Sequence, residues 1–441
     1  MNTPIFDFVK RYAKEGAVRL HMPGHKGKPR LGCEPLDITE IDGADVLYTA
    51  GGIIAESEKN AAMLFESGAT LYSTEGSSLC IKAMLALVSE GKPQTRILAA
   101  RNAHKAFMYA AALLDLSVSW IGKPQEHLCE CRLTPSEVRT ALEKEHFDAV
   151  YLTSPDYLGQ LADVAGIGAV CKEKGVPLLV DNAHGAYLAF LSPSLHPLAL
   201  GADLCCDSAH KTLPTLTGGA YLHIAKDALC RFHRAAERML SLFASTSPSY
   251  LTLASLDLTN AYLAEEMPSR LKGVMKATNE LKARLTQKGY PVCEGEPLKL
   301  VLKASQMGYT GEELARRLAE QQIVAEFFDR EFLVLMISPE NEISELRELG
   351  NALLSIPPRE ALSYEMPKLP PFTPIISPRA AILGRGERIP VEDAEGRICG
   401  APSVSCPPAV PIVISGERIT REHIALLRFY GIETIDVVAE S

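Results

Sequence analysis

The sequence predicts an α/β protein whose largest domain is built on a mainly parallel sheet. Between about residues 70 and 225, short β-prone runs alternate with stretches whose apolar residues recur at helical spacing. Such alternation is typical of βαβ units. A chain of 441 residues is also too long for one simple core, so we expect two or three domains.

The N-terminal segment, residues 1–50, begins with a helix-like stretch and continues into a loop. Apolar residues at helical spacing predict a helix over residues 4–15. The loop that follows, His21-Met22-Pro23-Gly24-His25-Lys26-Gly27, is rich in glycine and basic side chains. It lacks the spacing of a Walker A phosphate loop.

The large domain is expected over residues 51–290. Its predicted strands are 70–72, 97–99, 118–121, 149–152, 177–180, 203–206 and 220–224. Its predicted helices are 81–90, 135–145 and 167–174, followed by a mostly helical region over 226–288 with breaks at Pro248 and Pro268. The last two strands are so close in sequence that we expect a hairpin-like return between them.

Two smaller parts are expected after the large domain. A small α/β domain is predicted over residues 291–356, from runs at 298–302, 311–321 and 332–336. Residues 357–378 are rich in proline and predict a linker. The C-terminal domain, 379–441, holds short β-like segments and a final helix beginning near Thr420.

Composition excludes several classes of protein. A net charge of -9 argues against general nucleic-acid binding, which needs a basic surface. No apolar run approaches the ~20 residues that span a membrane, and the mixed, charged N-terminus does not resemble a signal peptide. The eleven cysteines are scattered without zinc-site spacing, so we expect no metal and a cytoplasmic protein with reduced thiols.

Two segments combine the charged groups that pyridoxal phosphate needs. Lys211 follows a strand-like stretch within Asp207-Ser208-Ala209-His210-Lys211-Thr212-Leu213, and Asp181 ends an earlier one. In enzymes that use this cofactor, a lysine amine forms a Schiff base with the aldehyde and a carboxylate faces the ring nitrogen. Either residue alone is more often a loop or capping residue. The pair in this order predicts a cofactor site.

The phosphate of such a cofactor needs an anion site, and the turn after the first strand of the large domain offers one. Gly76 lets the backbone approach closely, and Ser77 and Ser78 place hydroxyl and N–H groups at the start of a helix. The alternative is a plain serine cap.

Other histidines and a serine could complete the site. His104, in the loop after the 97–99 strand, could stack on a pyridine ring or move protons, although a surface histidine is the simpler alternative. His184 could brace Asp181 or line the pocket. Ser208 and His210 could reach the phosphate or the substrate.

With these motifs in place, the chain resembles the Orn/Lys/Arg decarboxylase family of fold-type I pyridoxal phosphate enzymes, in the short form of Gram-positive bacteria. The matching segments are His21-Met22-Pro23-Gly24-His25-Lys26-Gly27, Asp37-Ile38-Thr39-Glu40, Gly76-Ser77-Ser78, Arg101-Asn102-Ala103-His104-Lys105, Asp181-Asn182-Ala183-His184-Gly185, Ser208-Ala209-His210-Lys211-Thr212-Leu213 and, more weakly, Pro407-Pro408-Ala409-Val410-Pro411.

The resemblance implies a role for each of these residues. Lys211 is similar to the Schiff-base lysine, Asp181 to the partner of the ring nitrogen, and His104 to the residue that stacks on the ring. Ser77, Ser78, Ser208 and His210 resemble phosphate ligands. Thr217 matches a position that reaches the phosphate of the neighbouring subunit. A homodimer or higher homo-oligomer is implied, with sites shared between subunits.

The implied reaction is decarboxylation of arginine, lysine or ornithine to the amine and CO2, in amino-acid metabolism and polyamine biosynthesis. The substrate amine displaces Lys211, the ring accepts the electron pair left at Cα, and Lys211 or His210 returns a proton. The sequence offers substrate candidates in the N-terminal loop, namely His25, Lys26 and Asp45, with further acids at Asp37, Glu40 and Asp42.

Three departures from the family pattern concern the substrate. The acidic residue usual near the C-terminus is replaced by Ala401, a Tyr-Pro-Pro-Gly run is replaced by one beginning at Cys406, and Asn182 stands where Glu is usual. Two alternatives therefore stay open. One is another fold-type I reaction, such as transamination or elimination. The other is a protein that binds the cofactor but has drifted in specificity and lost decarboxylase activity.

Overall fold

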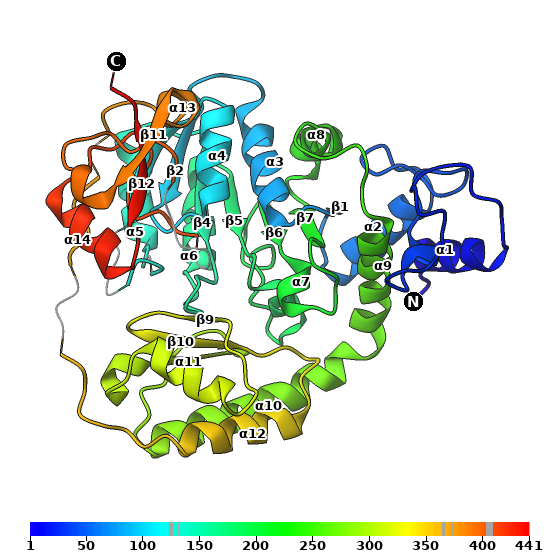
Figure 1. Cartoon of the computed structure of the whole chain (residues 1–441). Coiled ribbons are helices and arrows are strands. Elements are labelled where there is room, and N and C mark those ends of the chain that lie inside the picture. The colour runs from blue at the N-terminus through cyan, green and yellow to red at the C-terminus, as the bar shows by residue number, and fades with distance from the viewer. Residues whose placement is uncertain (123–126, 131, 364–366, 373, 403–408, 441) are drawn as a thin grey trace. The chain divides into compact units, whose positions relative to one another are not determined.

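The computed structural model describes residues 1–441 apart from 123–126, 131, 364–366, 373, 403–408 and 441 (Figure 1). The chain divides into two compact units. The first comprises Met1–Gly91, Asp148–Ser154 and Val164–Ser269, and the second comprises Lys92–Phe147, Pro155–Asp163 and Arg270–Ser441. Within the described residues, no helix is both long enough and apolar enough to span a bilayer.

Five sheet strands, in the order β1-β7-β6-β5-β4, form the centre of the first unit. Its strands are β1 (Ala69–Ser73), β4 (Ala149–Thr153), β5 (Leu178–Asp181), β6 (Leu204–Asp207) and β7 (Ala220–Ile224). β4, β5 and β6 are parallel, whereas β7 is antiparallel to both β6 and β1. β1 therefore runs in the same direction as β4, β5 and β6, and these four strands end at one edge, which we call the carboxyl edge.

Every residue of β1, β5, β6 and β7 is buried, as expected for strands covered on both faces. The helices of this unit are α1 (Pro4–Lys14), α2 (Ile53–Leu64), α3 (Ser77–Ser89), α6 (Val164–Lys174), α7 (Ala209–Thr212), α8 (Leu229–Ser241) and α9 (Tyr250–Glu265), with short 3-10 turns at Glu34–Leu36 and Ala186–Phe190. α3 lies against four of the strands and against α8 (Figure 1). Because it is apolar almost all round, it forms a layer between the sheet and α8.

The second unit holds three small β structures. β2 (Arg96–Ala100) and β3 (Ser117–Ile121) pair in parallel, and β8, β10 and β9 form an antiparallel sheet. β11 pairs with β12 in antiparallel fashion. The remaining elements are α4 (Lys105–Leu113), α5 (Pro135–Lys144), α10 (Met267–Gln287, which crosses the boundary between the units), β8 (Lys299–Lys303), α11 (Gly311–Ala319), β9 (Phe327–Phe328), β10 (Phe332–Met336), α12 (Ile343–Leu354), α13 (Pro378–Leu383), β11 (Gly386–Pro390), α14 (Arg421–Phe429) and β12 (Thr434–Val438).

The structure confirms the expected strands and the return from β6 to antiparallel β7. The helices α2, α4, α7, α12 and α13 and the short strand β9 were not expected. The expected break near Pro268 is present, because α9 ends at Glu265 and α10 begins at Met267. Pro268 itself lies in the first turn of α10, where a missing N–H costs nothing. The boundaries of the five expected parts stay predictions.

Candidate active site

The residues predicted to hold a cofactor gather at the carboxyl edge of the first unit. β1 is followed by Gly76 and Ser77, β5 ends on Asp181, and β6 is followed by the turn that carries Lys211. Ligands of open α/β sheets bind outside this edge, because the loops there converge while the strands stay rigid. Three distant segments of the chain thus supply one candidate site.

Lys211 is held on α7, a single helical turn directly after β6. Its side chain is half-buried, and its Nζ lies 3.0 Å from Nε2 of His184. His184 comes from the loop after β5 and is itself buried. The two residues are 27 positions apart, so their contact depends on the parallel pairing of β5 with β6.

Asp181 offers a buried carboxylate near that amine. Burial raises its pKa above the ordinary value, and the positive charge of Lys211 acts in the opposite direction. Its Oδ1 accepts a hydrogen bond from the N–H of Ala183 at 3.2 Å, and its Oδ2 accepts one from the hydroxyl of Tyr151 at 3.4 Å. A carboxylate in such a place is stabilised by a cation, which a protonated ring nitrogen would provide.

An anion cradle lies at the start of α3. Gly76 has a φ of 74°, and a Cβ there would meet no atom closer than 4.0 Å, so open space faces this backbone. The N–H of Gly76 donates a hydrogen bond to the carbonyl oxygen of Gly218 at 2.7 Å. Ser208 donates a hydrogen bond from its Oγ to Oγ of Ser77 at 2.8 Å, which joins the hydroxyl from β6 to the helix N-terminus.

This arrangement fits a phosphate. The N-terminus of α3 carries the positive end of the helix dipole, and its first N–H groups have no partner within the helix. Ser78, the second residue of α3, is partly exposed and can add a hydroxyl. The predicted phosphate ligands Ser77, Ser78 and Ser208 are therefore brought together with Gly76, although their role stays a prediction.

His210 has a defined protonation state. Its Nδ1 lies 3.0 Å from the carbonyl oxygen of Gly219, which can only accept, so Nδ1 carries the proton. Burial lowers the pKa of His210, and the charge of Lys211 acts in the same direction. The lowered pKa favours the neutral ring, whose Nε2 can accept a hydrogen bond.

Two further predicted residues have contacts or surroundings of their own. Thr217 is exposed in the turn between α7 and β7. His104 belongs to the second unit, where it caps α4 by accepting a hydrogen bond at Nδ1 from the N–H of Ala106. That contact leaves the proton on Nε2, and the proposed stacking on the cofactor stays a prediction.

The N-terminal loop gives the substrate candidates different tasks. Nε2 of His25 lies 3.1 Å from Oδ2 of Asp37, and Lys26 donates to the carbonyl of His21. Asp45 accepts hydrogen bonds from several backbone N–H groups, namely those of Val46, Gly51, Gly52, Ile54 and Ala55.

Asp45 therefore caps α2, and its oxygens are already occupied by backbone donors. Its expected contact with the substrate stays a prediction. Of the C-terminal departures, Ala401 is half-buried and carries no acid, whereas Cys406 lies outside the described residues.

One cluster was missed at the level of sequence. Asp207, the last residue of β6, is fully buried between His196 and His223. Burial acts to raise the pKa of Asp207, but the two histidines outweigh it and hold the pKa below the ordinary value. The only sequence signal was an acid at the buried end of an apolar strand, next to the Lys211 segment.

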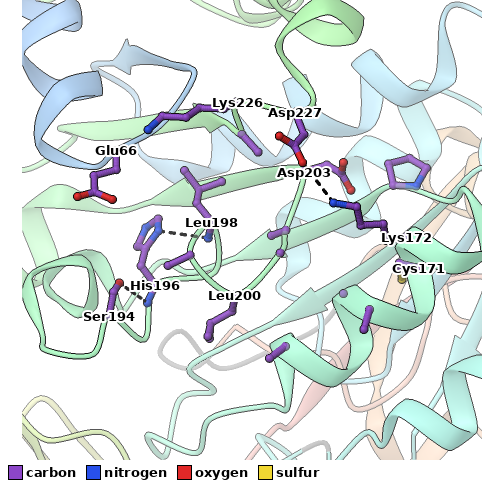
Figure 2. A pocket seen from close by; sticks show the side chains of 18 of the residues that line it. Glu66, Cys171, Lys172, Ser194, His196, Leu198, Leu200, Asp203, Lys226 and Asp227 are labelled. Atoms are coloured by element: carbon purple, nitrogen blue, oxygen red, sulfur yellow. Dashed lines mark hydrogen bonds and ion pairs between the residues drawn. The ribbon is translucent and has the colours of Figure 1, made fainter.

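A pocket of about 850 Å³ opens on the opposite edge of the same sheet, at the amino ends of β5 and β6 (Figure 2). Three of its charged side chains, namely Asp203, Lys172 and Asp227, have hydrogen-bond or ion-pair partners. Asp203 accepts a hydrogen bond from the N–H of Leu178 at 2.8 Å, and Lys172 pairs with Asp227 at 3.3 Å. His196 forms part of its wall, so the pocket reaches the edge of the Asp207 cluster.

Comparison with known proteins gives consistent matches along the chain. Residues 3–296 match the family model for the Orn/Lys/Arg decarboxylase major domain, and residues 362–434 match its C-terminal domain. An arginine decarboxylase of Bacillus subtilis (strain 168) is 29% identical over 461 residues, which cover 96% of this chain and 93% of that protein.

Solved structures show the fold. The lysine decarboxylase LdcF of Francisella novicida superimposes with a TM-score of 0.80 at 16% identity, over 99% of this chain and 81% of that one. The constitutive lysine decarboxylase of E. coli gives 0.77 at 18% identity, over 99% and 82%. The fold-type I architecture is confirmed.

Proposed function

The chain belongs to the Orn/Lys/Arg decarboxylase family, and from that premise we propose that it removes CO2 from a basic amino acid with pyridoxal phosphate bound at Lys211. The observation that carries the proposal is the meeting of three groups at one edge of one unit. These are a lysine amine, a buried carboxylate and an anion cradle, from Lys211, Asp181 and the Gly76–Ser77 turn.

Pyridoxal phosphate, when bound, supplies an aldehyde for an amine and a protonated ring that accepts the electron pair left by the departing CO2. The residues present fit that group. The N-terminus of α3 and the hydroxyl of Ser208 would hold the phosphate, and Asp181 would keep the ring nitrogen protonated. Lys211 would occupy the aldehyde until the substrate amine displaces it.

The structure also favours one proton donor over another. After CO2 leaves, the α-carbon of the substrate takes up a proton. The lowered pKa of His210 favours its neutral ring, and its Nδ1 proton is donated to the carbonyl of Gly219, so it is a poor donor. Lys211, freed by the substrate, carries an ammonium that can donate. We assign the proton transfer to Lys211 and a supporting contact to His210.

We propose arginine, lysine or ornithine as substrate, supported by family membership and by relatives named as arginine decarboxylases. The distal cation of such a substrate needs an acid, because a buried unpaired charge is costly. Asp45 is occupied and Asp37 faces His25. Glu40, Asp42 or an acid from a second subunit are the remaining candidates of the set.

We further propose a homodimer with shared sites in the cytoplasm. Thr217 is exposed, as a residue that reaches a neighbouring subunit must be. The described cysteines form no disulfides, which suits a reducing compartment.

The decisive experiment incubates the purified protein with pyridoxal phosphate and a panel of amino acids and identifies the products by mass. We expect CO2 and the amine of a basic amino acid. A keto acid would indicate transamination. Turnover of neutral amino acids alone would reject the proposed substrate class and direct attention to Ala401. Cofactor binding without any product would favour a binding protein with drifted specificity.

A further inference from the structure

Asp207 sits at the centre of a buried polar cluster directly beneath the candidate site. It ends β6, one residue before Ser208, and it is fully buried. Its Oδ2 lies 3.1 Å from Nε2 of His196 and 3.2 Å from Nε2 of His223. A buried carboxylate is expensive unless donors surround it, so this one requires its partners.

The two rings act as hydrogen-bond donors and not as ligands of a shared metal. Nδ1 of His196 accepts a hydrogen bond from the N–H of Leu198 at 3.4 Å (Figure 2). The proton of the neutral ring is therefore on Nε2, the nitrogen that lies near Asp207. Nδ1 of His223 lies 2.8 Å from Oγ1 of Thr70, which can donate to it in the same way. A metal at Nε2 would require the opposite tautomer of His196.

Asp207 also contacts Asn182, the residue next to Asp181 of the candidate site. Its Oδ1 accepts a hydrogen bond from Nδ2 of Asn182 at 2.7 Å, and Asn182 directly follows Asp181. The N–H of Asn182 also bonds the carbonyl of Cys206 at 2.9 Å. Asn182 is fully buried, and its Oδ1 would lie only 2.0 Å from a Cβ at Gly185, so no side chain fits there.

Strand geometry separates the cluster from the reacting groups. Successive side chains point to opposite faces, so Cys206 and Ser208 share one face and Cys205 and Asp207 the other. Sγ of Cys206 contacts Oδ1 of Asp181 at 3.7 Å, which places Asp181 on the face of Ser208. Asp207 therefore lies on the face opposite Asp181, and its hydrogen bond with Asn182 links it to the residue next to Asp181.

We propose that Asp207 is a positioning residue, which holds Asn182 by a hydrogen bond and so fixes the end of β5 with Asp181 aimed at the cofactor nitrogen. This inference rests on the proposed function of Asp181. The proposed role also explains why residue 182 is an asparagine. A glutamate or aspartate there would place a second carboxylate against Asp207, with no hydrogen to donate between the two groups.

The test reads the bound cofactor and not turnover alone. Wild type and the variants D207N, N182A and D181N are loaded with pyridoxal phosphate, and the absorption of the bound cofactor is recorded against pH. D257N is the matched control. Asp257 is also a buried carboxylate of the first unit with backbone and hydroxyl donors, from Ile5, Phe6 and Ser57, but it is bonded to none of the site residues.

We expect D207N and N182A to shift the absorption-versus-pH curve in the direction of D181N, by a smaller amount, while D257N follows wild type. The turnover number kcat should fall by on the order of tenfold, the size of one charge-assisted hydrogen bond, with KM little changed. If Asp207 and Asn182 served stability alone, D207N and N182A would have a lower Tm but the same absorption-versus-pH curve as the wild type.

The outcomes separate the two proposals. If D181N shifts the curve and neither D207N nor N182A does, the positioning role is wrong and the proposed function stands. If D181N itself leaves the curve unchanged, the assignment of Asp181 fails and the positioning role fails with it. Should D207N not fold, N182A decides alone, because it removes the link while leaving Asp207 between its two histidines.

Discussion

At the scale of single residues, the environment of each side chain decides its task. The same type of group, a carboxylate, is a candidate cofactor ligand at Asp181, a helix cap at Asp45 and the centre of a histidine cluster at Asp207. The three carboxylates differ in the hydrogen-bond donors that surround them. Only Asp181 lies close to a lysine amine at an open edge of the sheet, so only Asp181 suits the ring nitrogen.

Replacing Lys211 with Ala should reduce turnover by several orders of magnitude, because the cofactor anchor and the proton donor disappear together. Borohydride reduction of the wild type should fix the cofactor to the peptide that contains Lys211. Lys226, which lies at the opposite edge of the sheet, provides the control, and Lys226→Ala should keep both label and activity. Label recovered on another lysine would reject the assignment.

Replacing Asp181 with Asn should preserve the fold and weaken the ability of the cofactor ring to accept the electron pair left by CO2. The lost charge-assisted interaction is worth about 1.5–3 kcal/mol, and the rate should suffer more than cofactor affinity. Steady-state kinetics and a titration with the cofactor separate the two quantities. A variant with the wild-type rate would show that Asp181 has no such role.

At the scale of elements, the sheet places the site and the helix ends complete it. β5 and β6 run parallel, so the residues after them emerge side by side. α3 begins at the same edge and contributes its N-terminus. α2 depends on a distant cap, because its own N-cap, Gly52, has no side chain and Asp45 supplies the missing acceptor.

Replacing Asp45 with Ala should destabilise the protein by about 2 kcal/mol, since a helix cap is lost and alanine is strained at the positive φ of 70° found there. Asp45→Asn should cost less, because asparagine keeps an acceptor and tolerates this backbone. Urea denaturation measures both free energies of unfolding. Equal losses in the two variants would contradict the capping role.

The same carboxylate predicts a dependence on pH. Burial acts to raise the pKa of Asp45, but the backbone donors of Gly51, Val46 and Gly52 outweigh it, so the folded-state pKa is lowered. A lowered pKa contributes stability that is present above the unfolded value and is lost as pH falls through the folded value. Below about pH 4, the difference in stability between wild type and Asp45→Asn should therefore shrink.

At the scale of the whole molecule, the proposed sharing of sites makes assembly part of the function. The exposed Thr217 lies six residues beyond Lys211, yet the family resemblance sends its hydroxyl to another subunit. If a ligand is held by two chains, it stabilises the dimer by mass action. Pyridoxal phosphate should then favour association in sedimentation experiments.

Mixing two inactive variants tests this directly. Thr217→Asp should repel the phosphate, and Lys211→Ala removes the anchor. In a mixed dimer one site would carry both lesions and the other none, so activity should return up to about one site in two. Thr217→Ser keeps the hydroxyl and is the control. A monomer with full cofactor occupancy and full activity would exclude shared sites.

Much of this molecule can be predicted from its sequence. The strands β1 to β8 and β10 and several of the helices, such as α3, α5, α6 and α11, follow from apolar runs and helical spacing, because both patterns indicate which face of an element is buried. The motifs after β1, β5 and β6 could be assigned to one edge, because parallel strands end together. Lys211, Asp181 and the Gly76–Ser78 turn were found in this way.

Other features depended on contacts that no local pattern records. His196, Asp207 and His223 meet from a loop and two strands, and Asp45 reaches the start of α2 across a turn. Periodicity gives the face on which a side chain lies, but the donors that a buried carboxylate meets are set by the packing of distant segments. The sequence alone therefore determined the fold class and pointed to the candidate cofactor residues, while only the tertiary structure decided that Asp45 is a cap and that Asp207 lies beneath Asp181.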